Sequence, residues 1–474
     1  MAPIPIPTLH NITDDPKSGG FSLDPVGVSG FFGGEEVISA LATVHLETER
    51  RWLGWYNSPG SYNIGRTYGQ LADSKFWRGL FPGRREEPEV VFKLDGSKGP
   101  RYVGAFSGTC IIDTGHLASL LMDKCKQESK ELSAPGRQGS TSYLNVVSLV
   151  DVDHDDIRLR TPRLTIAFAI LPIIVNLACC AMCALGGDWF CFAIILIGIL
   201  AGGISNIVIG AGAVKVDYNK NPAKGSPPGD GLLIGSAEVT IIRGREMDTN
   251  IITKGRFRID SANVYNRRLT GFCSFLLLLQ FLAQLLLVPQ GTFMGQVWFL
   301  TSLAASWAYT SFFPSKEHDD VQQKFLWKKL GDPHIHRFKF GSRTAMAVFA
   351  VLALEPTCPM EMVDELLSNK TTVWRIWRQI LKTELSRLRD EESEKETESV
   401  DFDLEVAFHS LSDGDKTLLE NLKHDLRTGI KVYEDFMGLG CCLNPPLPGL
   451  LPVNASAARS RHTLTSNSEQ TLVH

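Results

Sequence analysis

The chain has 474 residues, of which 44% are hydrophobic and 21% charged, and its formal net charge at pH 7 is −4. By length it can hold two or three soluble domains, and so small a net charge gives no reason to expect a nucleic-acid partner. The N-terminus shows no basic segment followed by an apolar one, so we expect no cleavable signal peptide. The whole-chain averages hide an asymmetry, because the apolar residues are concentrated between residues 164 and 313.

The polar region that precedes the apolar residues is expected to contain mixed secondary structure. Residues 1–30 are rich in proline and glycine and are expected to be disordered. Residues 31–155 are expected to form a small cytosolic α/β region. Helical spacing of apolar residues predicts a helix over residues 35–51 that packs on its own domain, and a second helix is expected over residues 115–125. Short strands are expected at residues 90–93, 102–106, 110–113 and 143–152.

Four apolar stretches without a charged residue follow. The first two occupy residues 164–185 and 189–214, and the second two occupy residues 269–288 and 291–313. A bilayer core about 30 Å thick needs roughly 20 apolar residues as a helix, because lipid offers no hydrogen-bond partner to an open backbone group. The sequence therefore predicts an α-helical polytopic membrane protein with four transmembrane helices arranged as two hairpins.

Basic residues collect on one side of these stretches. They precede the first stretch, outnumber the acids in the loop at residues 215–268 and follow the last stretch, whereas the two hairpin turns contain no lysine or arginine. By the positive-inside rule, both termini and the middle loop are expected in the cytosol. The charge pattern does not distinguish the plasma membrane from an internal membrane.

The remaining cytosolic segments are predicted from turn residues and helical spacing. In the middle loop, residues 232–242 and 250–258 are rich in β-branched residues and predict a β-hairpin. A mainly helical cytosolic region is expected over residues 314–437. Its helices are expected over residues 343–354, 360–388 and 413–436.

The C-terminal tail, residues 438–474, is rich in proline, serine and threonine and is expected to be disordered. It contains the adjacent pair Cys441 and Cys442, which is a candidate for S-palmitoylation. An unmodified tail is the alternative.

Small and polar residues inside the apolar stretches predict either helix packing or a polar path. Small residues let helix backbones approach, and an Asn there can form a hydrogen bond across the contact. The second stretch has such residues at four-residue spacing, and the third has two glutamines on one face: Gly198, Gly202, Asn206 and Gly210, then Gln280 and Gln284. We expect packing, including a homo-oligomer through the second stretch, with a polar substrate path as the alternative. The stretches lack Asp, Glu, Lys, Arg and His, which disfavours a proton relay or a voltage sensor.

The catalytic candidate is Asp113. Residues 110–115, with the sequence CIIDTG, resemble the apolar-apolar-Asp-Thr-Gly signature of pepsin-like and retroviral-type aspartic proteases. That resemblance implies two aspartates that share a proton, and the sequence has no second Asp-Thr-Gly or Asp-Ser-Gly, so it implies a symmetric dimer. His116 follows the motif where those families usually carry Ser, Thr or Ala. The alternative is that Asp113 or Thr114 caps a helix beginning at Gly115.

Two other groups of residues have ligand chemistry without the spacing of a known metal site. His334 and His336 have no further ligand nearby in the sequence, and the acidic residues between 151 and 156 do not follow the EF-hand pattern. The sequence contains no Walker A, G-x-S-x-G or H-E-x-x-H string. We therefore expect neither a metal nor a cofactor.

Four short runs carry a resemblance to a family: GQVWFL at residues 295–300, SLA at residues 302–304, SWAY at residues 306–309 and TKGRF at residues 253–257. They are similar to a group of uncharacterised multi-pass membrane proteins from fungi, and the similarity covers roughly residues 240–345. The resemblance supports the membrane assignment. It implies no activity and no catalytic residue.

The leading functional hypothesis is a non-enzymatic, membrane-anchored scaffold or interaction protein with cytosolic protein partners. It follows from the large polar regions expected in the cytosol and from the absence of charged residues in the apolar stretches. The alternative is a subunit of an oligomeric channel or transporter. The third hypothesis is an aspartic-protease-like enzyme that acts through Asp113.

Overall fold

The computed structural model describes residues 33–72, 74–83, 86–128, 130–134, 136–137, 139–259, 264–312, 314–389 and 411–440. The expected disorder of residues 1–30 and of the tail beyond residue 440, with its Cys441 and Cys442, lies outside the described residues. The chain divides into two compact units. The helical unit comprises Met1–Leu94, Arg158–Lys215 and Arg258–Gln322, and the α/β unit comprises Asp95–Ile157, Val216–Phe257 and Gln323–His474.

Three helices of the described chain are long and apolar enough to cross a membrane. They are α7 (Arg163–Leu185), α8 (Trp189–Ile209) and the stretch Arg268–Gln290, which combines most of α10 (Val264–Leu287) with the 3-10 turn η3 (Val288–Gln290). The Asp188 carboxylate accepts a hydrogen bond from the backbone N–H of Cys191 at 3.0 Å and so caps the start of α8. These helices match the first three stretches that the sequence predicted.

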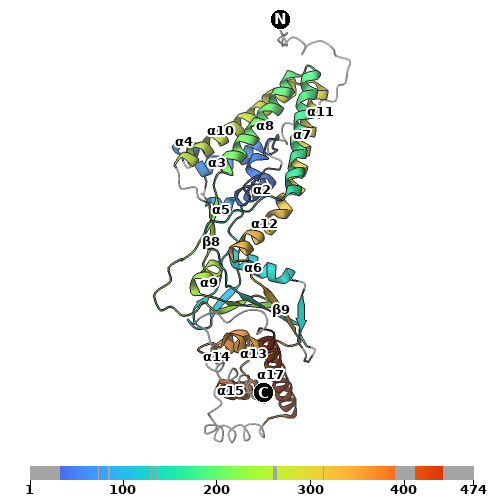
Figure 1. Cartoon of the computed structure of the whole chain (residues 1–474). Coiled ribbons are helices and arrows are strands. Elements are labelled where there is room, and N and C mark those ends of the chain that lie inside the picture. The colour runs from blue at the N-terminus through green and yellow to red at the C-terminus, as the bar shows by residue number, and fades with distance from the viewer. Residues whose placement is uncertain are drawn as a thin grey trace, which may run out of the picture. The chain divides into compact units, whose positions relative to one another are not determined.

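The fourth predicted stretch forms the uncharged helix α11 (Phe293–Phe312), which packs against α7 (Figure 1). It is less apolar than the other three because its buried face carries amide and hydroxyl side chains, namely Gln296, Ser302, Ser306 and Thr310. The helix α12 (Pro314–Lys329) follows it.

Residues 34–94 pack with the apolar helices, whereas we expected them to fold with residues 95–155. Their elements are α2 (Gly34–Leu46), η2 (Arg50–Trp52), α3 (Ser61–Ala72), α4 (Lys75–Leu80) and α5 (Pro88–Val91). α3 lies along α10, and α2 contacts α8 and α11. The helix expected at residues 35–51 is present as α2. The strand expected at residues 90–93 is wrong, because Pro88 stands in the first turn of a short helix there.

The α/β unit is built on a seven-stranded mixed sheet in the order β2-β1-β6-β7-β4-β9-β3. The strands are β1 (Arg101–Gly104), β2 (Cys110–Ile111), β3 (Glu131–Ser133), β4 (Ser142–Ser148), β6 (Gly231–Ile234), β7 (Glu238–Arg243) and β9 (Ile335–Phe340). β4 is parallel to β7 and antiparallel to β9, with Asn145 opposite both Thr240 and Arg337. The expected strands at residues 102–106, 110–113 and 143–152 correspond to β1, β2 and β4.

The β-hairpin expected in the middle loop has different partners from those predicted. β6 pairs antiparallel with β7, so both arms lie within residues 231–243 and the connection falls at residues 235–237. The second predicted arm contains helix α9 (Glu246–Thr253) and strand β8 (Arg256–Ile259), and β8 pairs with β5 (Val214–Asp217) in a separate two-stranded sheet. The β-branched residues at 251–252 face the core from a helix, because burial outweighs their strand propensity.

Alternate residues of the sheet face opposite sides, as strand geometry requires. The apolar face packs on α13 (Arg343–Leu354), α14 (Pro359–Leu366), α15 (Thr372–Arg389) and α17 (Asp413–Gly440), whereas α6 (His116–Gln127) and α9 lie on the other side of the sheet (Figure 1). The helix expected over residues 360–388 is divided into α14 and α15. Arg378 stabilises the break by donating to the carbonyls of Leu367 and Asn369.

Candidate functional site

The helical unit contains a group of buried amide and hydroxyl side chains between its apolar helices, which we call the central polar cluster. Its members come from α3, α7, α10, α11 and the non-helical segment at residues 53–60: Asn57, Ser61, Asn176, Gln280, Gln284, Ser302 and Ser306. All are buried. Burying a polar group in an apolar environment costs free energy unless the group is hydrogen-bonded. The role of this cluster therefore depends on the hydrogen-bond partners of its members.

Asn57 connects three of the apolar helices. Its backbone N–H donates to Oδ1 of Asn176 on α7 at 3.0 Å, and its Nδ2 donates to Oγ of Ser302 on α11 at 3.1 Å. Its Oδ1 accepts a hydrogen bond from Nε2 of Gln280 on α10 at 2.9 Å. The non-helical segment is therefore fixed at the centre of the unit by side chains that lie far apart in the sequence.

Asn176 uses its full hydrogen-bonding capacity in this cluster. Its Oδ1 accepts a second bond, from Oγ of Ser302 at 2.8 Å, and its Nδ2 donates to Oγ of Ser306 at 3.0 Å and to the carbonyl of Pro172 at 2.8 Å. A buried Asn with every site satisfied rigidifies its surroundings. The contact between α7 and α11 is thus specified by polar bonds in addition to shape.

The two glutamines that the sequence placed on one face of α10 both point to the N-terminal segment. Oγ of Ser61 donates to Oε1 of Gln284 at 3.3 Å, and Nε2 of Gln280 also lies 3.4 Å from the carbonyl of Ser58. One buried acceptor, Oε1 of Gln280, and one buried donor, Nε2 of Gln284, are without a partner among the described residues, one helical turn apart.

The glycine row of α8 makes room for the same segment. A Cβ atom on Gly198 would collide with the side chain of Asn57, one on Gly202 with the carbonyl of Tyr56, and one on Gly210 with the side chain of Val44. Nδ2 of Asn206, in the same row, donates to the carbonyls of Arg50 and Arg51 at 3.1 and 3.0 Å. The sequence suggested this face of α8 for helix packing or for a polar path. In the structure, residues of the chain's own N-terminal segment pack against it.

A cavity of about 40 Å³ lies beside this segment, with α2, α3, α8, α10 and α11 around it. Polar residues that line it include Arg50, Tyr56 and Asn206. The Arg50 guanidinium lies 3.3 Å from the Glu47 carboxylate, and both side chains are buried. The volume has room for a few water molecules.

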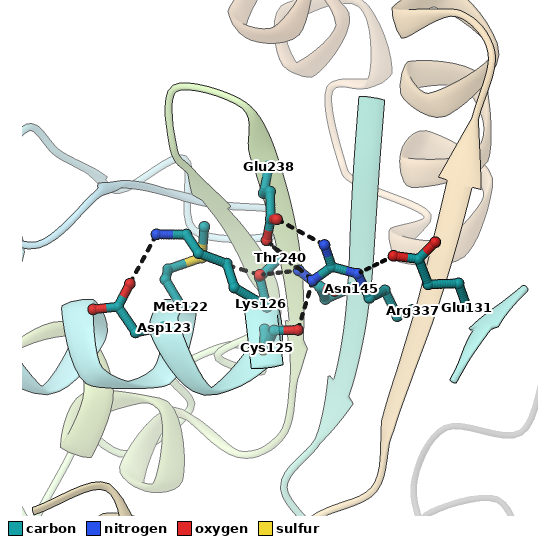
Figure 2. A network of polar contacts seen from close by, with 9 residues as sticks. All are labelled: Met122, Asp123, Cys125, Lys126, Glu131, Asn145, Glu238, Thr240 and Arg337. Carbon is teal, nitrogen blue, oxygen red and sulfur yellow. Dashed lines mark hydrogen bonds and ion pairs between the residues drawn. The ribbon is translucent and has the colours of Figure 1, made fainter. Parts of the chain in front are cut away.

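A second buried polar network lies in the α/β unit, on the side of the sheet that α6 covers (Figure 2). The Arg337 guanidinium pairs with Glu238 at 2.9 Å and donates to the carbonyl of Cys125 at 2.6 Å, and Glu131 lies 3.4 Å from its Nε. Nδ2 of Asn145 donates to Oγ1 of Thr240 at 3.2 Å. Arg337 and Glu238 are both buried, so this network fixes the register of strands that are not sequential and has the features of a structural ion pair.

Asp113 is exposed on the surface of the α/β unit. Its carboxylate lies 3.2 Å from Nζ of Lys98, and both side chains are more than half exposed. It does not cap α6, because the cap residue Gly115 shows no side-chain hydrogen bond and Thr114 donates to the carbonyl of Pro100. The aspartic-protease hypothesis stays a prediction, since it depends on a second chain.

The remaining ligand candidates do not form a cluster. Across the described ranges no three His, Cys, Asp or Glu side chains converge on a metal-sized site. His334 precedes β9 and His336 is part of it. His154, from the acidic stretch, contacts the hydroxyl of Tyr218 at 2.7 Å and the carboxylate of Asp248 at 3.2 Å, which ties that stretch to α9.

Sequence reasoning missed the residue at the centre of the polar cluster. Asn57 belongs to the string Asn-Ser-Pro-Gly at residues 57–60, which has the composition of a surface turn. The sequence did contain a signal that buried polar partners must exist, namely the amides of Asn176, Gln280 and Gln284. These side chains lie inside apolar helices and needed hydrogen-bond partners there.

Comparison of the chain with protein-family models, with curated proteins and with solved structures finds no match. The functional argument therefore rests on the residues themselves.

Proposed function

We propose that the chain is an integral membrane protein in which α7, α8, α10 and α11 all span the bilayer, with the basic loops and both termini in the cytosol. For α11, the support is its length of 20 residues and the placement of its polar side chains in the bundle interior. Several of its large apolar side chains face outward, among them the exposed Phe293, Met294 and Phe312. The orientation is supported by the basic residues that flank the spans.

In this arrangement the N-terminal segment re-enters the bilayer from the cytosolic side. Asn57 contacts Gly198 on α8 and Ser302 on α11, each about ten residues from the start of its helix and so at a depth of about 15 Å. α3 then runs back along α10, from Ser61 beside Gln284 to Ala72 beside Gly271. Non-helical backbone at this depth is tolerated where protein surrounds it, and the central polar cluster provides those surroundings.

The function that this geometry supports best is a membrane-anchored scaffold or interaction protein. The observation that carries the proposal is that residues 53–61 fill the centre of the bundle and bind the polar side chains there, beside a cavity with room for a few water molecules. The helical unit then serves as an anchor, and the α/β unit, with its large polar surface, offers the contacts for cytosolic protein partners.

Purification from native membranes in mild detergent, with chemical crosslinking and mass spectrometry, tests this proposal. The scaffold hypothesis predicts cytosolic proteins that co-purify at fixed ratios and crosslink to lysines of the α/β unit. A chain lacking the α/β unit is unsuitable as a control, because the unit is assembled from three separate segments. The matched control is the full chain with reversed charges on exposed residues of one face of α17. A homo-oligomer without partners would contradict the scaffold hypothesis.

The second candidate is a subunit of an oligomeric channel or transporter. It is favoured by the non-helical segment at mid-depth and by the open acceptor and donor on Gln280 and Gln284. Solute flux into liposomes tests it: Gln284→Leu should abolish flux, and Gln290→Leu, at an exposed position near the same helix end, should not. The proposed homo-oligomer through α8 would use its exposed Leu196 and Leu200, because the glycine row is already covered.

A further inference from the structure

The short helix α4 presents apolar side chains to its surroundings while one aromatic residue holds it in place. Trp77 is buried, and its Nε1 lies 2.8 Å from the position that a Cβ of Gly271 would take on α10. The Trp77 ring also stacks on Phe81, with ring centroids 6.1 Å apart and planes inclined by 6°. Phe76 and Leu80, four residues apart and therefore on one helix face, are 66% and 48% exposed.

Cationic side chains lie on the same element. Lys75 and Arg78 are exposed beside Phe76 and Leu80. Gly271, which receives Trp77, follows the exposed Arg268 by three residues, and Arg268 is the first residue of the apolar stretch Arg268–Gln290. α4 is therefore packed against the end of α10 that the proposed orientation places at the cytosolic surface of the bilayer.

A second pair with the same chemistry lies at the corresponding end of α8. Trp52 is 52% exposed, and the guanidinium of Arg51 lies 5.2 Å from the centre of its ring. Arg51 is held at this end, since its Cβ lies 2.8 Å from the position of a Cβ on Gly210, the C-cap residue that directly follows α8. One N-terminal segment thus supplies exposed aromatic side chains at the same end of two apolar helices, together with the exposed cations of α4 and the half-buried Arg51.

We infer that α4 and the Arg51–Trp52 pair form a binding surface for anionic phospholipids of the cytosolic leaflet, a conclusion that rests on the proposed membrane orientation. Aromatic side chains favour the boundary between acyl chains and headgroups. Lysine and arginine at that level attract negatively charged lipids. Phe76 and Leu80 would enter the acyl boundary, with Lys75, Arg78 and Arg51 among the headgroups.

Fluorescence quenching by brominated lipids tests this surface in the full-length protein. An environment-sensitive probe is attached to Phe76→Cys in a chain whose Cys110, Cys358, Cys441 and Cys442 are replaced by serine. The protein is reconstituted into vesicles of phosphatidylcholine and phosphatidylserine in which one lipid or the other carries brominated chains. The matched control is Phe275→Cys, at a position on α10 that is 53% exposed.

We expect brominated phosphatidylserine to quench the probe at residue 76 more strongly than brominated phosphatidylcholine at the same mole fraction. The local enrichment should reach at most about fivefold for each cation, and Lys75→Gln with Arg78→Gln should remove it. At residue 275 the two lipids should quench equally.

The other possible quenching results each contradict a different part of the proposal. Equal quenching by both lipids at residue 76 would overturn the preference for anionic headgroups. If only residue 275 is quenched, a protein partner or a second copy covers α4. If neither residue is quenched, the membrane assignment itself is wrong. Failure of the lipid-binding proposal and failure of the membrane assignment therefore give different results.

Discussion

The backbone N–H of Asn57 donates to the side-chain Oδ1 of Asn176 at 3.0 Å, which joins two residues that lie 119 positions apart. Asn176 is in an apolar helix, and Asn57 is in the non-helical segment at residues 53–60. Each residue alone would be costly to bury, because amide groups transferred out of water need hydrogen-bond partners. Together they explain why a polar N-terminal segment is folded into an apolar bundle.

Replacing Asn57 with leucine should destabilise the helical unit strongly. The substitution keeps the approximate size but removes the bonds to Ser302 and Gln280 and leaves both partners buried, which should cost about 2–4 kcal/mol. The measurement is the midpoint of thermal unfolding in detergent. Gln290→Leu is the control, since its amide is exposed and, among the described residues, donates to the carbonyl of Leu286 alone. Equal midpoints for the two variants would show that Asn57 does not hold the bundle together.

Gly198 and Asn57 should show coupled effects, because a Cβ on Gly198 would collide with the Asn57 side chain. Gly198→Ala alone should lower the unfolding midpoint, whereas Gly79→Ala should not, since in the described part of the chain no atom outside its own helix turn lies within 4 Å of a Cβ there. In an Asn57→Ala background the Gly198→Ala change should cost less, as expected for residues in contact. Strict additivity of the two changes would instead place the effect of Gly198 at another contact.

The sequence predicted the apolar helices and three of the seven strands of the larger sheet, because these elements depend on local patterns. Helix α13 was predicted from its apolar run, and β1, β2 and β4 from short runs of strand-forming residues. The placement of residues 34–94 was missed because it depends on non-local bonds such as those of Asn57, Ser61 and Asn206. The same limit explains α9, where buried Ile251 and Ile252 resemble a strand but lie in a helix.

His45 should make the helical unit sensitive to acid. Its Nδ1 lies 3.0 Å from the carbonyl of Gly212, and since a carbonyl only accepts, Nδ1 carries the proton. Nε2 is buried without a partner among the described residues, and burial lowers the pKa of His45 to about 4. The unfolded chain, with a pKa near 6.5, therefore binds more protons between pH 6.5 and 4, so stability falls as the pH decreases through this window, by up to about 3 kcal/mol.

The variant His45→Asn tests that assignment, because its Nδ2 can replace the Nδ1 donor without titrating. The unfolding midpoint of the wild type should decline from pH 6.5 towards pH 4, and the slope should be smaller in the variant. An unchanged slope would assign the acid sensitivity to another group.

The cysteines of the α/β unit should differ sharply in reactivity. Burial raises the pKa of the Cys125 thiol to about 12, and its side chain is inaccessible. Cys110 and Cys358 are exposed. Since the thiolate is the reactive form, a maleimide should label Cys110 and Cys358 in the folded protein and Cys125 only after denaturation. Mass spectrometry of peptides reads the labelling, and modification of native Cys125 at a comparable rate would contradict the placement of α6.

Two ion pairs of Figure 2, Arg337–Glu238 and Lys126–Asp123, should respond very differently to loss of a charge. Glu238→Gln leaves the buried Arg337 guanidinium without its nearest carboxylate, and removing one partner of such a pair costs about 3–5 kcal/mol. Asp123→Asn, in the pair with Lys126 at 2.8 Å, removes a contact between side chains that are about half exposed and should cost less than about 1 kcal/mol. Thermal unfolding of the full chain measures the stability of both variants.

Replacing Glu238 and Arg337 together with leucine should restore part of the stability that Glu238→Gln loses, because no buried charge is then left unpaired. If the double variant is less stable than Glu238→Gln, the network contributes to the fold through its other bonds, from Arg337 to the carbonyl of Cys125 and to Glu131.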